Sequence, residues 1–247
     1  MGSSATKFSR DTLTEIRQRF AQNGRLGQGA QPIQMQIEPD GALLLEGEVD
    51  RVAQKKIVLE LAAAHPSIHA IVDRLRVRPA ERLTDAAIRN HLRDVFALDP
   101  SLSGLAITEL GSAAQATAIS RPEAAAGAFD YSVSDGVVTL NGTVKDLAIK
   151  RYIGVLAWWC PGSRDVINGI VATSDDSDGP DRIADAVRIV LEKDPYYDAA
   201  QIKVGVRQRV VRLTGWLPSV DQSRMAENDA WYLFGVDDVI NEIETPE

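Results

Sequence analysis

Few residues in this chain have the types and spacing that catalysis or metal binding requires. The sequence of 247 residues contains three histidines and one cysteine: His65, His69, His91 and Cys160. His65 and His69 are four residues apart, but Pro66 lies between them and interrupts the helix that would place both imidazoles on one face. We therefore predict solvated histidines, and a lone cysteine that packs as a small apolar side chain instead of forming a disulfide.

The best pattern for a cation lies just before a predicted helix. The segment from Ser174 to Gly179 has aspartates at alternate positions, and Asp185 follows six residues after the glycine, which partly imitates a calcium-binding loop. A helix start explains the same residues, because Asp178 or Gly179 can cap the helix while Pro180 occupies its first turn. We predict the helix start, with no metal and no cofactor. The sequence holds no serine-hydrolase, phosphate-loop or zinc-protease motif, so we predict no enzyme.

The charge of the chain is placed unevenly. The formal net charge is −8, yet residues 1–172 hold 19 Lys+Arg and 19 Asp+Glu, whereas residues 173–247 hold 8 and 16. The excess of negative charge therefore lies entirely in the last third. Phosphate backbones and anionic lipid headgroups both attract clustered basic residues. We predict that nucleic acid is not a partner and that anionic lipid is disfavoured at this end.

Two observations bear on the compartment. The sequence has no run of 18 or more apolar residues, so no transmembrane helix is expected. Its first ten residues lack the apolar segment of a secretion signal. We therefore expect a cytoplasmic protein, or a periplasmic one if a leader has been removed.

Three segments of the chain repeat a strand–turn–strand pattern. They comprise residues 36–49, 131–144 and 204–217. In the first two, Asp40-Gly41 and Asp135-Gly136 separate apolar runs, which is typical of a hairpin whose type I′ turn needs positive φ at both central residues. The third copy has Gln208-Arg209 at this point, so we predict a turn of another type there.

A glycine in the second strand of each copy fixes the register of the repeat. The distances from Gly47 to Asp73, from Gly142 to Asn168 and from Gly215 to Asn241 are each 26 residues. The positions ten, eleven and fifteen after each glycine lie on one helical face, and we predict that this face packs into the core. We expect each glycine to lie where another backbone or a helix approaches closely, and the matched Asp or Asn to have a structural role.

Another helix precedes the hairpin in each copy. The helical pattern covers Ile16 and Phe20 in the first copy, residues 85–98 in the second and residues 181–192 in the third. The chain is therefore predicted to have an α+β fold of three tandem, two-layer α-β-β-α-β modules. In each module a three-stranded sheet would bury one face against two helices. We place the modules at residues 1–79, 80–173 and 174–247.

These features resemble the BON (bacterial OsmY and nodulation) domain family. The resemblance rests on the α-β-β-α-β order, on residues 135–144 and on the closing residues 166–170. The glycine typical of the family's second strand falls at Gly142 and Gly215, and at Gly47 in the divergent first copy. Known BON proteins bind phospholipid surfaces, act in envelope stress or osmotic response, or in one cytoplasmic case bind potassium. The resemblance thus implies the fold but leaves the function open.

The second copy carries an insertion. Asp99 to Gly136 spans 37 residues, whereas Asp194 to Arg209 spans 15, which is a difference of 22 residues. The extra residues include a stretch rich in alanine and serine near 111–127. Such a stretch buries little, so we predict a mobile surface loop. We favour a tolerated loop insertion over a docking arm.

Paired aromatic residues end the second helix in two of the copies. They are Trp158, Trp159, Trp231 and Tyr232, at equal register, whereas the first copy has Ala63-Ala64 there. Because the first copy lacks aromatics at this register, we predict that the four side chains form an interaction surface, with a neighbouring module or another chain. Protein is the favoured partner, since few basic residues lie near them to attract lipid.

We therefore predict a non-catalytic binding or assembly protein that makes protein–protein contacts or self-associates. Three similar modules offer repeated, non-identical faces that can associate head to tail. An envelope or osmotic-stress setting is implied by the resemblance alone. Two alternatives stay open: a protein that binds phospholipid surfaces, and a cytoplasmic protein that binds potassium or another cation.

Overall fold

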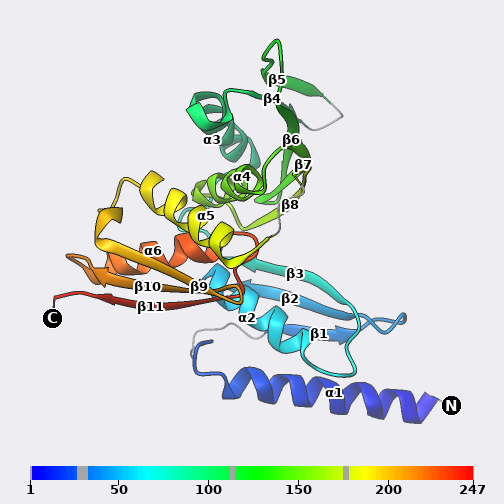
Figure 1. The fold of residues 1–247 in the computed structure, drawn as a ribbon. Helices are drawn as coiled ribbons and strands as arrows, with labels where there is room; N and C mark the ends of the chain where they lie inside the picture. Colours follow the sequence, from blue (N-terminus) through cyan, green and yellow to red (C-terminus); the bar gives the residue numbers. More distant parts are fainter. Residues whose placement is uncertain (1, 27–32, 112–114, 175–177, 247) are drawn as a thin grey trace. The chain divides into compact units, whose positions relative to one another are not determined.

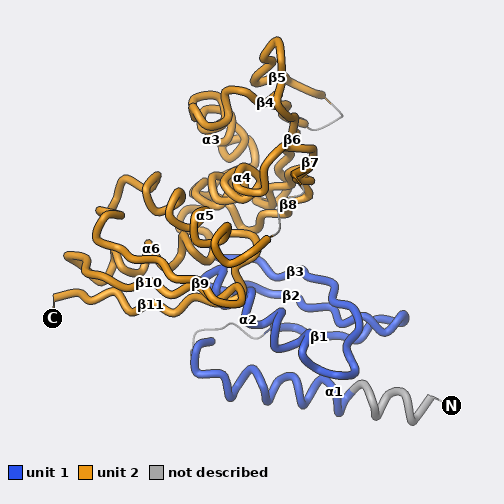
Figure 2. Tube along the Cα trace, in the orientation of Figure 1, with its two compact units in different colours: residues 1–78 blue, residues 79–247 orange. Residues whose placement is uncertain are grey.

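A computed structural model describes residues 2–26, 33–111, 115–174 and 178–246 of the chain. The chain divides into two compact units, residues 1–78 and residues 79–247 (Figure 2). Unit 1 holds the first module, and unit 2 holds the second and third. The helices and three separate sheets confirm the predicted α+β fold class.

The first module has two layers, as predicted. Its elements are α1 (Gly2–Gln22), β1 (Gln34–Ile37), β2 (Leu43–Val49), α2 (Val52–Ala63) and β3 (Ile71–Val77) (Figure 1). Strand β2 is central, antiparallel to β1 and parallel to β3. Alternation along the strands places Leu43, Leu45 and Leu75 in the core, where α2 covers the sheet. Helix α1 packs against α2 and β1.

The second module has five strands instead of the three predicted. Its elements are α3 (Asp85–Leu98), η1 (Pro100–Leu102), β4 (Leu105–Leu110), β5 (Ala116–Ser120), β6 (Gly127–Ser134), β7 (Val137–Val144), α4 (Leu147–Trp159) and β8 (Asp165–Ala172). The strand order is β5-β4-β6-β7-β8. The insertion therefore extends the sheet: β4 pairs parallel with β6, and β5 pairs antiparallel with β4.

The prediction of a loop near 111–127 is wrong for the part that forms β5. Strand β4 explains why the sheet continues, because Leu105, Ile107 and Glu109 alternate inward and give it a buried face. The small residues of β5 then need only the backbone groups of β4 as partners. Residues 112–114 lie outside the described part of the chain.

The third module keeps the three-stranded pattern. Its elements are α5 (Pro180–Lys193), η3 (Ala199–Gln201), β9 (Ile202–Arg207), β10 (Val210–Trp216), α6 (Val220–Tyr232) and β11 (Asp238–Glu244). The strand order is β11-β10-β9. Within unit 2, α4 packs against both α5 and α6, so the helix layers of the two modules meet (Figure 1). This packing leaves the other face of each sheet directed outward.

Two of the three predicted hairpin turns differ from expectation. In the second module, Asp135 and Gly136 have φ of 52° and 71°, as a type I′ turn requires. In the first module, only Gly41 has positive φ, and its N–H donates to the carbonyl of Glu38, which makes a longer turn. In the third module, Gln208 and Arg209 both have positive φ, so this turn is also of the primed type despite its residues.

The second-strand glycines occupy equivalent places in the three central strands. Gly47, Gly142 and Gly215 have φ of 145°, 141° and 135°. A Cβ on Gly142 would lie 2.2 Å from the carbonyl oxygen of Ala128, and one on Gly215 would lie 1.9 Å from that of Gln201. The backbone of β6 near Gly142, and that of η3 just before β9 near Gly215, thus leave no room for a side chain, at a φ that L residues rarely adopt.

Candidate functional site

The predicted aromatic surface lies at the contact between the second and third modules. Trp158, at the end of α4, stacks on Tyr232, at the end of α6, with ring centroids 5.7 Å apart and planes 10° apart. Offset-stacked aromatic pairs of this kind stabilise a contact beyond the area that they bury. Two of the four predicted residues are therefore engaged inside unit 2.

The other two aromatic residues have different surroundings. Trp159 donates its Nε1–H to Oδ1 of Asp229 on α6, at 2.8 Å. Trp231 is only 1% exposed and belongs to the core of the third module. The structure thus brings Trp158, Trp159 and Tyr232 together at the module contact, whereas Trp231 lies in the core of the third module.

Asp229 is a buried carboxyl at the centre of this contact. It accepts a hydrogen bond from the hydroxyl of Tyr197 in addition to the one from Trp159. Burial raises the pKa of Asp229 to about 8; the nearby Asp194 acts in the same direction, and the bonds from Tyr197 and Trp159 oppose the shift. The carboxyl therefore keeps its proton in the folded chain at pH values where an exposed aspartate has lost it.

A buried arginine forms the second polar link between the modules. Arg151 of α4 is 1% exposed, donates its Nε–H to the carbonyl of Phe234 at 2.8 Å and pairs through Nη2 with Asp178. Arg209 also approaches Asp178, at 3.6 Å. A charge buried in an apolar helix needs such partners. Its place within an otherwise apolar helix is the sequence signal for this role.

The cation-loop alternative fits this geometry poorly. Gly179 is the N-cap of α5 and Pro180 its first residue, while Asp178 pairs with arginines. Asp176 lies outside the described residues. Within the described part of the chain, no group of three His, Cys, Asp or Glu residues could hold a metal ion.

The histidine prediction is partly wrong. His65 is buried, and its Nε2 lies 2.9 Å from Oε2 of Glu15, which joins α1 to the loop after α2. His69 and His91 are exposed. Cys160 is buried, as expected for a packing residue, and burial raises the pKa of its thiol to about 11. A thiol with such a pKa is a poor nucleophile at neutral pH.

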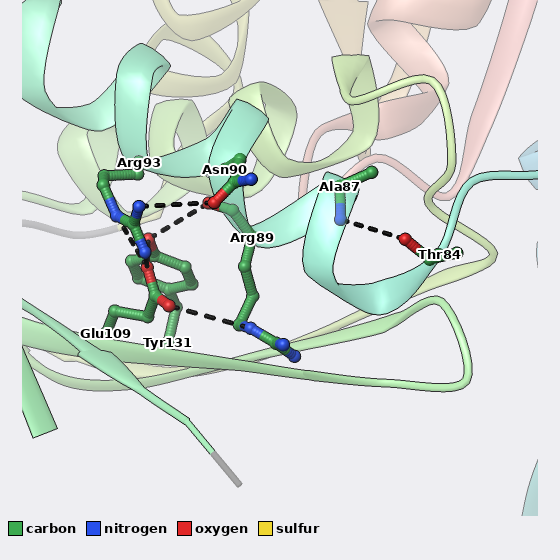
Figure 3. Close-up of polar contacts among 7 residues, drawn as sticks. All are labelled: Thr84, Ala87, Arg89, Asn90, Arg93, Glu109 and Tyr131. Carbon is green, nitrogen blue, oxygen red and sulfur yellow. Dashed lines mark hydrogen bonds and ion pairs between the residues drawn. The ribbon is translucent and has the colours of Figure 1, made fainter. Parts of the chain in front are cut away.

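Sequence reasoning missed a charged cluster that anchors the inserted strand β4. Glu109 of β4 is buried and accepts hydrogen bonds from Arg93 of α3, at 2.8 Å, and from the hydroxyl of Tyr131, at 2.9 Å (Figure 3). Arg89, one turn earlier, lies 3.7 Å from the other carboxylate oxygen. Burial and the bond to Glu109 raise the pKa of Tyr131. The cluster fixes β4 to α3, and a glutamate at an inward position of a strand was its only sequence signal.

The Asp and Asn residues that close the repeat share one structural role. The side-chain oxygens of Asp73, Asn168 and Asn241 each accept from the backbone N–H two residues later in the last strand. Asn168 and Asn241 also donate to backbone carbonyls of α4 and α6, and Asp73 pairs with Lys55 of α2. Each of these residues thus ties the last strand to the second helix.

We expect the stacked pair to couple the unfolding of the two modules. Trp158→Ala should weaken their contact by about 1 kcal/mol plus the lost apolar burial. Calorimetry should then resolve two melting transitions for unit 2, whereas unit 2 of the parent chain should melt in one. Trp216→Ala is the control, because Trp216 lies at the end of β10 and is half exposed. An unchanged melting profile for Trp158→Ala would show that the stack does not couple the modules.

The architecture is a tandem repeat of small two-layer α+β modules. The BON domain model matches residues 10–79, 112–174 and 180–247. This chain therefore belongs to the BON domain family, in three tandem copies, which confirms the resemblance. BON domains are generally binding or assembly modules, and the family is generally non-catalytic. None of the described helices is long and apolar enough to cross a membrane.

Two solved structures also align with nearly the whole chain. Both are of CdsD, described as a structural protein of the type III secretion system of Chlamydia trachomatis, one of them as its C-terminal domain. Each is 14% identical and covers 96% of this chain, the alignments span 98% and 94% of those chains, and the TM-score is 0.24 for both. Superposition at that score supports no inference about function. No protein with a curated description matches the chain.

Proposed function

We propose that this chain is a non-catalytic assembly protein that makes protein–protein contacts through the outer faces of its sheets. One observation carries the proposal: each module exposes an aliphatic side chain at the same place. Val72, Ile167 and Ile240 each lie 25 residues after the second-strand glycine, and they are 39%, 51% and 37% exposed. Exposed apolar patches mark interaction surfaces, and the recurrence of an exposed aliphatic side chain at one register in three copies supports a repeated contact.

The surroundings of these side chains make the three faces similar but not identical. On the same face, Val72 is followed by Arg74 and Arg76, whereas Ile240 is followed by Glu242 and Glu244. In the second module the corresponding positions are Gly169 and Val171.

Net charge follows the same trend. Residues 1–78 hold 11 Lys+Arg and 9 Asp+Glu, a net of +2, and residues 174–247 hold 8 and 16, a net of −8. Opposite charges at the two ends of the chain favour head-to-tail contact between copies over contact between like ends.

A three-residue variant tests the proposal. We expect Val72→Lys with Ile167→Lys and Ile240→Lys to reduce self-association of the full chain in a sedimentation-velocity concentration series. Its melting temperature should change little, because the three side chains are exposed in the folded chain. Leu98→Lys is the matched control, since Leu98 is exposed at the end of α3 and away from the sheet faces.

The same samples separate the alternatives. Association that persists in the triple variant contradicts the proposed role of the faces. Co-sedimentation of the parent chain with phosphatidylglycerol vesicles, lost in the triple variant while protein association remains, would favour a lipid-binding function. A shift of the sedimentation profile on replacing sodium by potassium would favour a cation-binding function.

A further inference from the structure

The edges of the sheets are protected unequally. In the last strands β3, β8 and β11, the backbone N–H of Leu75, Ile170 and Ile243 is already bonded to an Asp or Asn side chain. On the edge strand β9, Arg188 donates to the carbonyl of Val204. Side chains that occupy edge groups in this way hinder another strand from adding to the sheet.

Strand β5 differs from the four edge strands just named. Its sequence, Ala-Thr-Ala-Ile-Ser, contains no charge, proline or glycine, and residues 116–118 are exposed. Two of its five residues are β-branched, which suits a strand. Among the described residues, β5 carries no side-chain cap of the kind found on the other edges named above. An uncharged, uncapped edge is a template for an added strand.

The register identifies the backbone groups that β5 offers. Gly111 donates its N–H to the carbonyl of Gln115, and Glu109 lies opposite Thr117. In an antiparallel pair, alternate residues bond across the pair and the residues between them face away. The register shifts between Ile107 and Thr108, directly after Ala118, so this alternation holds from Gln115 to Ala118. Over these residues, the N–H and C=O groups of Ala116 and Ala118 are directed away from β4, toward an added strand.

We propose that β5 pairs antiparallel with β5 of a second copy of this chain, about a two-fold axis at Thr117. This register places Ala116 opposite Ala118 of the second copy, and Ala118 opposite its Ala116, which allows four backbone hydrogen bonds. The five-stranded sheet of the second module then continues into that of its partner. The inference rests on the proposed function, that the chain assembles through protein contacts, but it uses a separate surface.

Two properties of β5 favour a second copy over an unrelated peptide. The outward residues are related by symmetry, so each group that needs a partner finds its complement on an identical strand. The strand also carries no charge, so two copies approach without like-charge repulsion. Thr117 would face Thr117 of the other copy, and opposed threonines are a favourable cross-strand pair.

A proline at the edge tests the backbone pairing. Ala118→Pro removes an outward N–H, so it should weaken the β5-dependent dimer by about tenfold or more, whereas Ala118→Thr keeps the amide and should preserve it. Amide exchange at Ala116 and Ala118, followed by NMR, should slow as the concentration of the parent chain rises. Exchange that is independent of concentration overturns the proposal.

A charge-pair experiment guards against local unfolding in the proline variant. Thr117→Lys and Thr117→Glu should each weaken the dimer, because like charges then face each other on the axis. A 1:1 mixture of the two chains should recover it. Failure of the mixture to recover the dimer, with both chains folded, also overturns the proposal.

The surfaces can be told apart with variants already described. Association lost in the β5 variants but retained in the triple lysine variant supports the β5 pair and contradicts the sheet-face contact. The reverse pattern supports the sheet-face contact and overturns the β5 pair. A parent chain that stays monomeric at all concentrations overturns both.

Discussion

Replacing Gly142 by valine is expected to lower the free energy of unfolding of the second module by about 2–5 kcal/mol. A Cβ at this position would lie 2.2 Å from the carbonyl oxygen of Ala128 and 2.6 Å from the Cα of Phe129. Both atoms belong to the backbone of β6, which pairs with β7 from Ala128 to Ser134, so moving them aside would break that pairing. The φ of 141° adds strain that is independent of the available space.

Gly205→Val is the control for this prediction. Gly205 also lies within a strand, β9, but its φ is not positive and no atom lies within 4 Å of a Cβ placed there. Chemical denaturation should therefore show a large loss of stability for Gly142→Val and almost none for Gly205→Val. Equal stability of the two variants would contradict the close approach of β6 to Gly142.

The stability of unit 2 should fall as the pH rises from about 4 to about 8. The pKa of Asp229 is raised from 3.8 to about 8 in the folded chain, chiefly by burial. The folded chain thus keeps a proton that the unfolded chain loses, and stability decreases by up to about 1.4 kcal/mol per pH unit in this window. The stabilisation is complete below the unfolded pKa and is lost as the pH rises through the folded pKa.

Asp229→Asn should remove most of this pH dependence. The amide carries no charge at any pH, and its oxygen can accept the hydrogen bond from Trp159, so it stands in for the protonated carboxyl. The variant should be more stable than the parent chain at pH 9 and similar to it at pH 5, as measured by urea denaturation. Asp221→Asn, at an exposed carboxyl of the same helix, should keep the parent's pH dependence. A parallel pH profile for the Asp229 variant would show that this carboxyl titrates normally.

The repeat could be predicted because its landmarks are local. Helix positions follow from apolar spacing, and α3 begins and ends where the sequence pattern indicates. The extra strands of the second module could not be predicted, because β4 and β5 are held by Glu109, Arg93 and the neighbouring strand β6. These partners are distant in the sequence, and alternation over so short a segment does not distinguish strand from loop.

The third hairpin turn shows how distant contacts override local preference. Gln208 and Arg209 both take a left-handed conformation that costs about 1–2 kcal/mol per residue for side chains of this kind. The side chain of Arg209 pairs with that of Asp237, at 3.0 Å. The backbone N–H of Asp237 also donates to the carbonyl of Arg209. Arg209 also approaches Asp178. These contacts stabilise a turn that the dipeptide alone disfavours.

The sequence predicted that these aromatic residues form a contact surface, but it did not predict which side chains meet. Equal register made Trp158 equivalent to Trp231 and Trp159 equivalent to Tyr232, yet the stack joins Trp158 to Tyr232, which are not equivalent. Which side chain would face a neighbour and which would enter the core depends on how the two helix layers pack. That packing also determines the burial of Trp231 and the protonation of Asp229. A local sequence pattern does not predict how two helix layers pack.

The Asp and Asn residues of the last strands bear on how such a chain leaves the ribosome. Three alike modules appear in succession during synthesis, and the finished sheet of one is then close to the unfinished strands of the next. Tandem repeats are prone to exchange strands at this stage. Asp73, Asn168 and Asn241 each bond an edge amide of their own module, so a strand of the next module finds that amide already occupied.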